Sequence, residues 1–406
     1  MRAILLCLAL PLAAADPWPS FRGPGHDGFA PAFQAPVQWP AQVKLLWSAQ
    51  TGEGYSSPVV SETLVCVHSR QGEDEVVGCY DRASGQMRWS ARSASVFKKN
   101  SAATRMAPGP FATPLLHQGA LYTFSVNGEL TAYDAASGRV RWRRSPQRPP
   151  NTSSQFCGTA VPPFADSGRL VVYRGDDIQG GEALAFHPAD GRPLWSVRTG
   201  GPGYASFLAV TLDGVRQYVT LTDASVLALD AATGAVLWQH PFADQWHENI
   251  VTPVAAGGHI VVSGVRLGTK ALKPVRAGGK WTVAEVWASQ ETAMYMASPI
   301  AEGDYVYGLS SRNRGQLFCQ DARTGKLLWR SEPRLAEHAS LAAVGPDLLV
   351  SAVEGRAFVF ARSPARLELK ARFELSPKGA VYAQPALAGR HIYVKDESAL
   401  RALSLP

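Results

Sequence analysis

The sequence contains few charged residues and few of the short motifs that mark common enzymes. Only 18% of the 406 residues are Asp, Glu, Lys or Arg, whereas 46% are hydrophobic. Beyond residue 12, no apolar run approaches the roughly 20 residues that a membrane helix needs, and no stretch shows helical periodicity. The sequence also lacks a Gly-x-Ser-x-Gly nucleophile motif, a phosphate-binding glycine loop, a Cys-x-x-Cys-His haem site and a paired-histidine metal motif. We therefore expect no membrane span, and we assign no catalytic residue and no metal ligand.

The amino terminus has the features of a secretory signal peptide. A single Arg is followed by an apolar stretch, and the small residues Ala13, Ala14 and Ala15 precede Asp16. Small residues in this place are typical of a cleavage site. We expect residues 1–15 to be a signal peptide and the mature protein to be exported, either periplasmic or secreted. The net charge of +7 is modest for this length, so nucleic acid is not an expected partner of an exported chain.

One motif recurs along the chain. It consists of a small residue, an apolar residue, Asp, two variable residues, Ser or Thr, Gly, and a Trp four residues after the Gly. Full copies begin at Cys79, Ala132, Ala228 and Cys319, and a worn copy begins at Ala185. In a β-hairpin, the Asp side chain accepts backbone hydrogen bonds that start a tight turn, and the Gly adopts the positive φ that closes it. The Trp then lies on the returning strand, where its ring can pack between neighbouring sheets.

The Trp positions predict the number of repeating units. Successive members are 42 to 53 residues apart, and strands that often open on Ser-Pro, Thr-Pro or Gln-Pro lie between them. We expect the following residues to dock neighbouring units: Trp47, Trp89, Trp142, Trp195, Trp238, Trp287 and Trp329, with Phe373 in the eighth place. The last unit, residues 381–405, has no Trp strand, whereas the Trp47 strand precedes every unit. The N-terminal strand can therefore complete the last unit and close a ring.

These observations predict the fold and the domain organisation. We expect an all-β chain that forms an eight-bladed β-propeller of four-stranded antiparallel blades, closed by the N-terminal strand. Residues 43–406 would form the propeller. Residues 16–42 would form an extension packed on it, because Trp18, Phe21 and Phe29 are unfavourable in water. The oligomeric state expected for such a closed ring is a monomer.

Two cysteines can form a disulfide in the first unit. Strands around residues 63–69 and 76–81 flank a loop, which places Cys66 opposite Cys79. A cross-strand disulfide is possible in an oxidising compartment. The alternative is that Cys79 fills the position of the motif's small residue, which is Ala132, Ala185 or Ala228 in other copies.

A second set of equivalent positions suggests a binding site. Two residues before the Ser, Thr or Gln that opens each inner strand lie Tyr55, Phe111, Tyr204, Ile250, Met296, His338 and Tyr382, with Phe156 as the eighth. If these residues surround one mouth of the channel, they form an apolar funnel for a flat ligand or a peptide side chain. The alternative is that they pack blade against blade. The nearby sequence His247-Glu248-Asn249 is interpreted as a polar loop, because adjacent side chains on an extended chain point to opposite faces.

The repeats resemble those of the pyrroloquinoline quinone (PQQ)-like propeller family. The resemblance rests on the tandem Asp-x-x-Ser/Thr-Gly-x-x-x-Trp units, and it covers nearly the whole mature chain. The segment from Trp18 to Pro24, followed by Asp27-Gly28, is similar to the start of many exported members. The family includes quinoprotein alcohol dehydrogenases and the propeller lipoprotein of the outer-membrane β-barrel assembly machine.

The resemblance leads to two functional hypotheses. The first is an exported, non-catalytic scaffold that binds a protein or peptide partner in the cell envelope through its face loops or channel mouth, without a cofactor. The alternative is an oxidoreductase that depends on PQQ and Ca²⁺. Many of the family's dehydrogenases place a disulfide between adjacent cysteines against the quinone ring, and this sequence has no adjacent cysteines. We therefore expect the first function.

Overall fold

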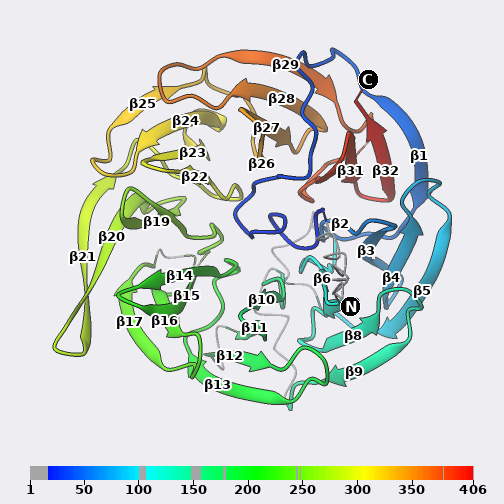
Figure 1. Ribbon diagram of the computed structural model, residues 1–406, viewed down its shortest axis with the longest axis horizontal. Helices are drawn as coiled ribbons and strands as arrows, with labels where there is room; N and C mark the ends of the chain where they lie inside the picture. The colour runs from blue at the N-terminus through cyan, green and yellow to red at the C-terminus, as the bar shows by residue number, and fades with distance from the viewer. Residues whose placement is uncertain are drawn as a thin grey trace, which may run out of the picture.

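The computed structural model of the protein describes residues 17–98, 100, 107–147, 157–176, 180–243, 246, 248–377 and 379–405. The predicted signal peptide, Phe156 and His247 lie outside the described residues. In the described part of the chain, the strands form eight four-stranded antiparallel sheets arranged in a ring (Figure 1). The predicted all-β, eight-bladed propeller is therefore confirmed. Within the same ranges, no helix has the length and apolar character needed to cross a bilayer.

In each of the first four blades, the strands follow one another from the axis to the rim in chain order. Blade 1 contains β2 (Val59–Val60), β3 (Leu64–Gln71), β4 (Asp74–Asp81) and β5 (Met87–Ala94). Blade 2 contains β6 (Leu115–His117), β7 (Ala120–Phe124), β8 (Leu130–Asp134) and β9 (Val140–Arg144). Blade 3 contains β10 (Phe164–Asp166), β11 (Arg169–Asp176), β12 (Gly180–Phe186) and β13 (Pro193–Thr199). Blade 4 contains β14 (Leu208–Leu212), β15 (Val215–Leu221), β16 (Ser225–Asp230) and β17 (Val236–Pro241).

The remaining blades follow the same order except at the point of closure. Blade 5 contains β18 (Val254–Ala256), β19 (His259–Gly264), β20 (Gly268–Ala277) and β21 (Lys280–Ser289). Blade 6 contains β22 (Ile300–Glu302), β23 (Tyr305–Ser310), the 3-10 turn η1 (Arg312–Arg314), β24 (Gln316–Asp321) and β25 (Leu327–Arg330). Blade 7 contains β26 (Ala339–Val344), β27 (Asp347–Ala352), β28 (Arg356–Ala361) and β29 (Leu369–Glu374). Blade 8 contains β30 (Ala386–Ala388), β31 (His391–Lys395), β32 (Ala399–Ser404) and, at its rim, β1 (Lys44–Gln50).

The N-terminal strand closes the ring, as the sequence predicts. Strand β1 pairs antiparallel with β32, from Lys44 opposite Ser404 to Gln50 opposite Ala399. The first and last parts of the propeller therefore share one sheet, and the ends of the ring cannot separate without breaking this pairing.

The motif turns have the local chemistry expected of them. The Asp81 carboxylate accepts hydrogen bonds from the Ala83 and Ser84 amides and from the Ser84 hydroxyl, at 2.8–3.1 Å. Gly85 closes the turn with a φ of +73°. The same carboxylate arrangement recurs at Asp134 and Asp230.

Each turn is also the docking place for the Trp of the preceding blade. The indole N–H of most motif Trp residues donates to a backbone carbonyl of the next blade, at 2.8–3.2 Å. The pairs are Trp47 with Arg82, Trp89 with Ala135, Trp142 with Pro188, Trp195 with Ala231, Trp287 with Ala322 and Trp329 with Ser363. A Cβ built on Gly85 would lie 2.5 Å from the Trp47 ring, and one on Gly138 would lie 2.5 Å from the Trp89 ring. The motif glycine therefore provides room for the ring as well as a positive φ.

Two blade junctions depart from this arrangement. Blade 5 joins β20 to β21 through Gly278 and Gly279, and the Trp238 indole of blade 4 donates instead to Gln217 of its own blade, at 2.8 Å. Blade 8 takes its outer strand from the N-terminus. There Phe373 stacks on Trp39, with ring centroids 6.3 Å apart, and Trp39 donates to the Asp347 carboxylate at 2.7 Å.

Residues 17–42 lie across the central opening, as the dark blue segment of Figure 1 shows. Trp18 is fully buried and pairs with Val60 of blade 1. Further along, Phe29 pairs with Ala343 of blade 7, and Phe33 with Gly389 of blade 8. All of these partners lie at or beyond the ends of inner strands, so the segment covers one end of the channel.

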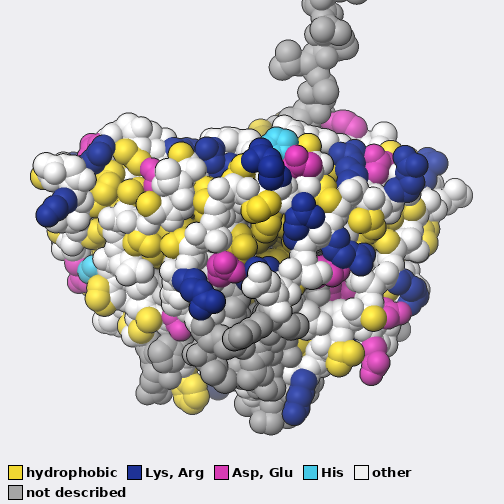
Figure 2. Space-filling model, turned by 90° about the horizontal axis from the view of Figure 1, so that it is seen from below, with side chains coloured by type: hydrophobic (Ala, Val, Ile, Leu, Met, Phe, Trp, Pro, Cys, Tyr) yellow, Lys and Arg dark blue, Asp and Glu magenta, His cyan; other side chains and the backbone are white. Residues whose placement is uncertain are grey.

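Cys66 and Cys79 form a disulfide between paired positions of β3 and β4, with their Cα atoms 4.1 Å apart. Cys319 is a free, buried thiol, and Cys157 is a free thiol that is partly exposed. On the side of the ring seen in Figure 2, basic and acidic side chains are intermixed among apolar ones. This visible side therefore shows no field of one sign.

Candidate binding site at the channel mouth

A cavity of about 410 Å³ opens at the end of the channel opposite residues 17–42. Its lining includes the described members of the predicted mouth set: Tyr55, Phe111, Tyr204, Ile250, Met296, His338 and Tyr382. Each lies just before the inner strand of its blade, so equivalent positions of seven blades converge on one space. Met296 and Tyr382 are 36% and 46% exposed, which makes them the open rim of the cavity.

Five rings form a continuous arc along this lining. Tyr55 lies between Phe111 and Tyr382, with centroid distances of 5.6 and 4.8 Å. The arc continues from Tyr382 to His338 at 6.4 Å, and from His338 to Tyr295 at 5.7 Å. Burial lowers the pKa of His338 despite the nearby carboxylates of Glu337 and Glu354, so its ring is neutral at pH 7. The arc is therefore an uncharged aromatic wall of the cavity.

Arg22 and Phe21 from the N-terminal segment also line the cavity, at its base. The Arg22 side chain is 2% exposed, and its guanidinium donates to the carbonyls of Asp27 and Pro299, at 2.8 and 2.5 Å. Burial lowers the pKa of Arg22 to about 10, so it remains charged at neutral pH. Its donors are directed to backbone carbonyls, which makes Arg22 a structural base of the cavity.

Polar side chains that open the inner strands link several blades around the channel. The Gln384 backbone amide donates to the Ser57 hydroxyl at 2.8 Å, and the Ser57 backbone amide donates to the Thr113 hydroxyl at 3.2 Å. On the other side, the Thr252 amide donates to the Ser298 hydroxyl at 3.1 Å. Gln384 also accepts from the Arg22 amide, at 3.2 Å. These bonds fix the strand ends from which the mouth residues project.

Carboxylates surround the aromatic arc. Glu248 lines the cavity and accepts a hydrogen bond from the Tyr295 hydroxyl, at 2.9 Å. Burial raises the pKa of the Tyr382 hydroxyl, and the negative charges of Glu337, Glu397 and Glu354 raise it further. The described residues thus place negative charge beside the aromatic arc.

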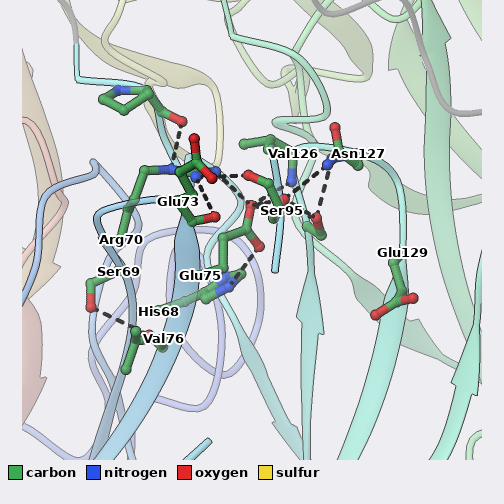
Figure 3. A network of polar contacts seen from close by, with 12 residues as sticks. His68, Ser69, Arg70, Glu73, Glu75, Val76, Ser95, Val126, Asn127 and Glu129 are labelled. Atoms are coloured by element: carbon green, nitrogen blue, oxygen red, sulfur yellow. Dashed lines mark hydrogen bonds and ion pairs between the residues drawn. The ribbon is translucent and has the colours of Figure 1, made fainter. Parts of the chain in front are cut away.

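A buried ionic network braces one wall of the mouth (Figure 3). The Glu75 carboxylate, 1% exposed, lies 3.0 Å from His68 Nε2 and 3.4 Å from the Arg70 guanidinium, and it accepts from the Val126 amide of blade 2 at 3.0 Å. Burial alone would raise the pKa of Glu75, but His68, the Val126 amide and Arg70 outweigh it and hold that pKa below its ordinary value.

The same network holds the segment that carries Phe111. Arg70 Nε donates to the Pro108 carbonyl at 3.2 Å. The Tyr55 amide donates to the Pro110 carbonyl at 2.9 Å, and the Tyr55 hydroxyl accepts from the Ala107 amide at 3.0 Å. Glu75 thus positions Arg70, and Arg70 with Tyr55 positions the wall of the cavity.

Comparison with known proteins identifies the family. Residues 73–331 match the PQQ-like repeat family model described as outer membrane protein assembly factor BamB. The chain belongs to this family. The family predicted from the repeat motif is therefore confirmed. The chain is similar both to BamB and to quinohemoprotein alcohol dehydrogenases.

The individual relatives align with only part of this chain. BamB of Yersinia pestis is 23% identical over 233 residues, which are 57% of this chain and 52% of that protein. Quinohemoprotein alcohol dehydrogenase ADH IIB of Pseudomonas putida is 29% identical over 140 residues, which are 32% of this chain and 19% of the enzyme. The chain thus spans about half of one curated relative and about a fifth of the other.

Solved structures share the fold at low sequence identity. BamB of Moraxella catarrhalis superposes with a TM-score of 0.60 at 16% identity, covering 89% of this chain and 99% of that one. Quinohemoprotein alcohol dehydrogenase ADHIIG of Pseudomonas putida HK5 has a TM-score of 0.66 at 13% identity, covering 96% and 80%. At such identities, the likeness concerns the propeller architecture.

The described lining does not fit the charge of the cofactor that the dehydrogenase relatives imply. PQQ is a polycarboxylate, and the cation in this lining, Arg22, already donates to backbone carbonyls. Glu248 lies in the same lining, and the rim carboxylates would repel a polyanion. For the accompanying Ca²⁺, the described residues contain no cluster of three or more His, Cys, Asp or Glu side chains suited to hold a metal ion. Among these residues, PQQ therefore lacks cationic groups to bind its carboxylates, and Ca²⁺ lacks a cluster of ligands.

Sequence reasoning missed several residues of the site. The sequence places Arg22 only in the N-terminal segment, and no sequence pattern singles out Tyr295. Asn249 of the predicted polar loop is buried and donates to the carbonyls of Thr222 and Phe242 at 2.8 and 2.6 Å, whereas Glu248 lines the cavity. The Glu75 network has one visible signal, namely His68, Arg70 and Glu75 in two strands whose central residues are mainly apolar.

Proposed function

We propose that this protein is an exported, non-catalytic propeller that binds an extended segment of a partner protein in the cell envelope, and that the segment inserts a side chain into the channel mouth. The observation that carries this proposal is the aromatic cavity of about 410 Å³, closed at its base by Phe21 and Arg22 and open at its rim. Such a volume is suited to one or two side chains, and a folded domain cannot enter it.

Export is supported by the sequence and by the covalent chemistry of blade 1. The proposed signal peptide directs the chain out of the cytoplasm. The Cys66–Cys79 disulfide is typical of an oxidising compartment such as the periplasm. The relatives named as outer membrane assembly factors make a protein partner in the envelope the natural proposal.

The side chains of the cavity support a binding role. The Ser57 hydroxyl accepts a hydrogen bond from the Gln384 backbone amide, so it belongs to the polar contacts that link neighbouring blades. Although Cys157 is partly exposed as a residue, desolvation of its sulfur, with the negative charge of Glu248, raises the pKa of the thiol to about 12. The thiol is therefore protonated and weakly nucleophilic at neutral pH. The neutral His338 lies among aromatic rings.

The test is peptide selection followed by a mutational comparison. The purified chain would select binders from a random 12-residue display library, and the enriched peptides would be titrated by fluorescence anisotropy. The mouth variant Tyr55→Ala/Phe111→Ala/Tyr382→Ala should weaken binding by at least about tenfold, which corresponds to about 1.4 kcal/mol. The matched control Met87→Ala/Val140→Ala/Leu369→Ala removes exposed apolar side chains from the outer strands and should leave the affinity unchanged.

Two outcomes would contradict the proposal. One is that no peptide is enriched, or that the mouth variant binds as the parent protein does. The other is one-to-one binding of PQQ in the presence of Ca²⁺, measured by calorimetry, which would favour the oxidoreductase alternative.

A further inference from the structure

We infer that the channel mouth selects a basic side chain, an arginine or lysine of the partner segment, and holds its charged head at the rim. This inference rests on the proposed function, because it names the chemistry of the segment that enters the same cavity.

The aromatic arc suits the two parts of a basic side chain. The rings of Phe111, Tyr55 and Tyr382 offer an apolar surface on which an aliphatic stem can pack. A guanidinium or ammonium above the face of a tyrosine is attracted by the ring quadrupole. Tyr382, nearly half exposed, is the ring that an incoming head group meets first.

Four carboxylates lie on loops near this arc. Glu248 precedes blade 5, Glu337 and Glu354 belong to blade 7, and Glu397 belongs to blade 8. Glu248 is anchored by the Tyr295 hydroxyl at 2.9 Å. Glu337 directly precedes His338, and its amide donates to the Glu354 carboxylate at 3.2 Å. Glu397 lies beside Gly379, 3.4 Å from a Cβ built there, and its charge acts on both Tyr55 and Tyr382.

In the described part of the chain, these carboxylates are not paired with cations. Among the residues that the structure describes, Glu248, Glu337, Glu354 and Glu397 form no ion pair with Lys, Arg or His, whereas carboxylates elsewhere on the ring do, as Asp166 does with Arg216. The site therefore presents negative charge that an incoming cation can neutralise.

Two described cations beside the cavity, Lys395 and Arg22, already donate to backbone carbonyls. Lys395 is 1% exposed and donates to the carbonyls of Gly54 and Asp396, at 2.6 and 3.1 Å. Arg22 is bound to carbonyls at the base. Because Arg22 repels a second cation, the charged head of the ligand would stay at the rim among the carboxylates, while its stem fills the funnel.

The experiment uses four fluorescein-labelled nonapeptides with identical Ser, Thr and Gly flanks and Arg, Lys, Leu or Glu at the centre, titrated against the purified chain. We expect the Arg and Lys peptides to bind about tenfold more tightly than the Leu peptide, and added salt to reduce only this advantage. In the variant Glu337→Gln/Glu354→Gln/Glu397→Gln, the Arg and Leu peptides should bind alike. The control Glu62→Gln/Asp213→Asn/Asp304→Asn makes the same charge change on turns of the opposite face and should keep the preference.

The outcomes separate this inference from the proposed function. If the Leu or Glu peptide binds as tightly as the Arg peptide and the Tyr55→Ala/Phe111→Ala/Tyr382→Ala variant weakens that binding, the mouth binds peptides but has no preference for a cation. The inference then fails and the proposed function stands. If no peptide binds, or if the aromatic variant leaves every affinity unchanged, both are wrong.

Discussion

Replacing Gly138 by Ala should destabilise the propeller more than the same replacement at a matched glycine. Gly138 has a φ of +72°, and an added Cβ would lie 2.5 Å from the Trp89 ring of the preceding blade. Gly168 has a φ of +74°, and no atom lies within 4 Å of its added Cβ. The backbone cost, about 1–2 kcal/mol for an L-residue in this region, is common to both. The clash adds about 1–3 kcal/mol at Gly138 alone, because the ring and its blade must move.

The assay is equilibrium unfolding in urea, followed by far-UV circular dichroism, with superimposable unfolding and refolding curves as a requirement. We expect Gly168→Ala to lower the free energy of unfolding by about 1 kcal/mol and Gly138→Ala to lower it by about 2–4 kcal/mol. In a Trp89→Leu background, Gly138→Ala should cost no more than Gly168→Ala, because the clashing ring is gone. If the two glycine variants differ by less than about 0.5 kcal/mol in the parent protein, the docking argument is wrong.

Three further predictions concern stability. The variant Cys66→Ala/Cys79→Ala should lose about 3 kcal/mol, since the disulfide closes a loop with a sequence separation of 13; dithiothreitol should lower the Tm of the parent protein and leave that of the variant unchanged. Glu75→Gln should cost about 3–5 kcal/mol in urea unfolding by leaving the buried Arg70 guanidinium uncompensated, whereas the control Glu62→Gln, at an exposed carboxylate, should cost under about 1 kcal/mol. Burial lowers the pKa of His26 from 6.5 to about 4, so between these pH values the unfolded chain binds a proton that the folded chain excludes. Stability should therefore fall as the pH drops from 6.5 to 4, by at most about 3 kcal/mol from this group, and a His26→Gln variant with an equally steep pH profile would contradict this assignment.

The blade count could be predicted because its signals are local. Asp81, Gly85 and Trp89 lie within nine residues of one another, and the hydrogen bonds from Ala83 and Ser84 to Asp81 are made inside a single turn. Four full copies and one worn copy of this motif, together with the regular Trp spacing that Phe373 completes, predict eight units. The missing Trp strand at the end predicts closure by the N-terminal strand. Blade 5 shows that the Trp spacing tolerates a missing turn motif, since β20 and β21 pair through a different turn.

The candidate site could be predicted only in part. Counting two residues back from each inner strand identifies Tyr55, Phe111 and Tyr382, because equivalent positions of successive blades take equivalent places around the axis. That rule does not identify cavity residues at other positions of the loops between blades. Glu248 and Tyr295, for example, share a hydrogen bond across two inter-blade loops.

Local sequence patterns thus specified the strands, the turns and their ring, because turn chemistry and strand alternation act over a few residues. The contacts that close and line the cavity are seen only in the tertiary structure. The Arg22 amide meets the Gln384 side chain across 362 residues, and Trp39 fills the junction at Phe373 where blade 8 has no turn. Such pairs depend on closure of the whole ring, which brings the ends of the chain together, and no short stretch of sequence encodes them.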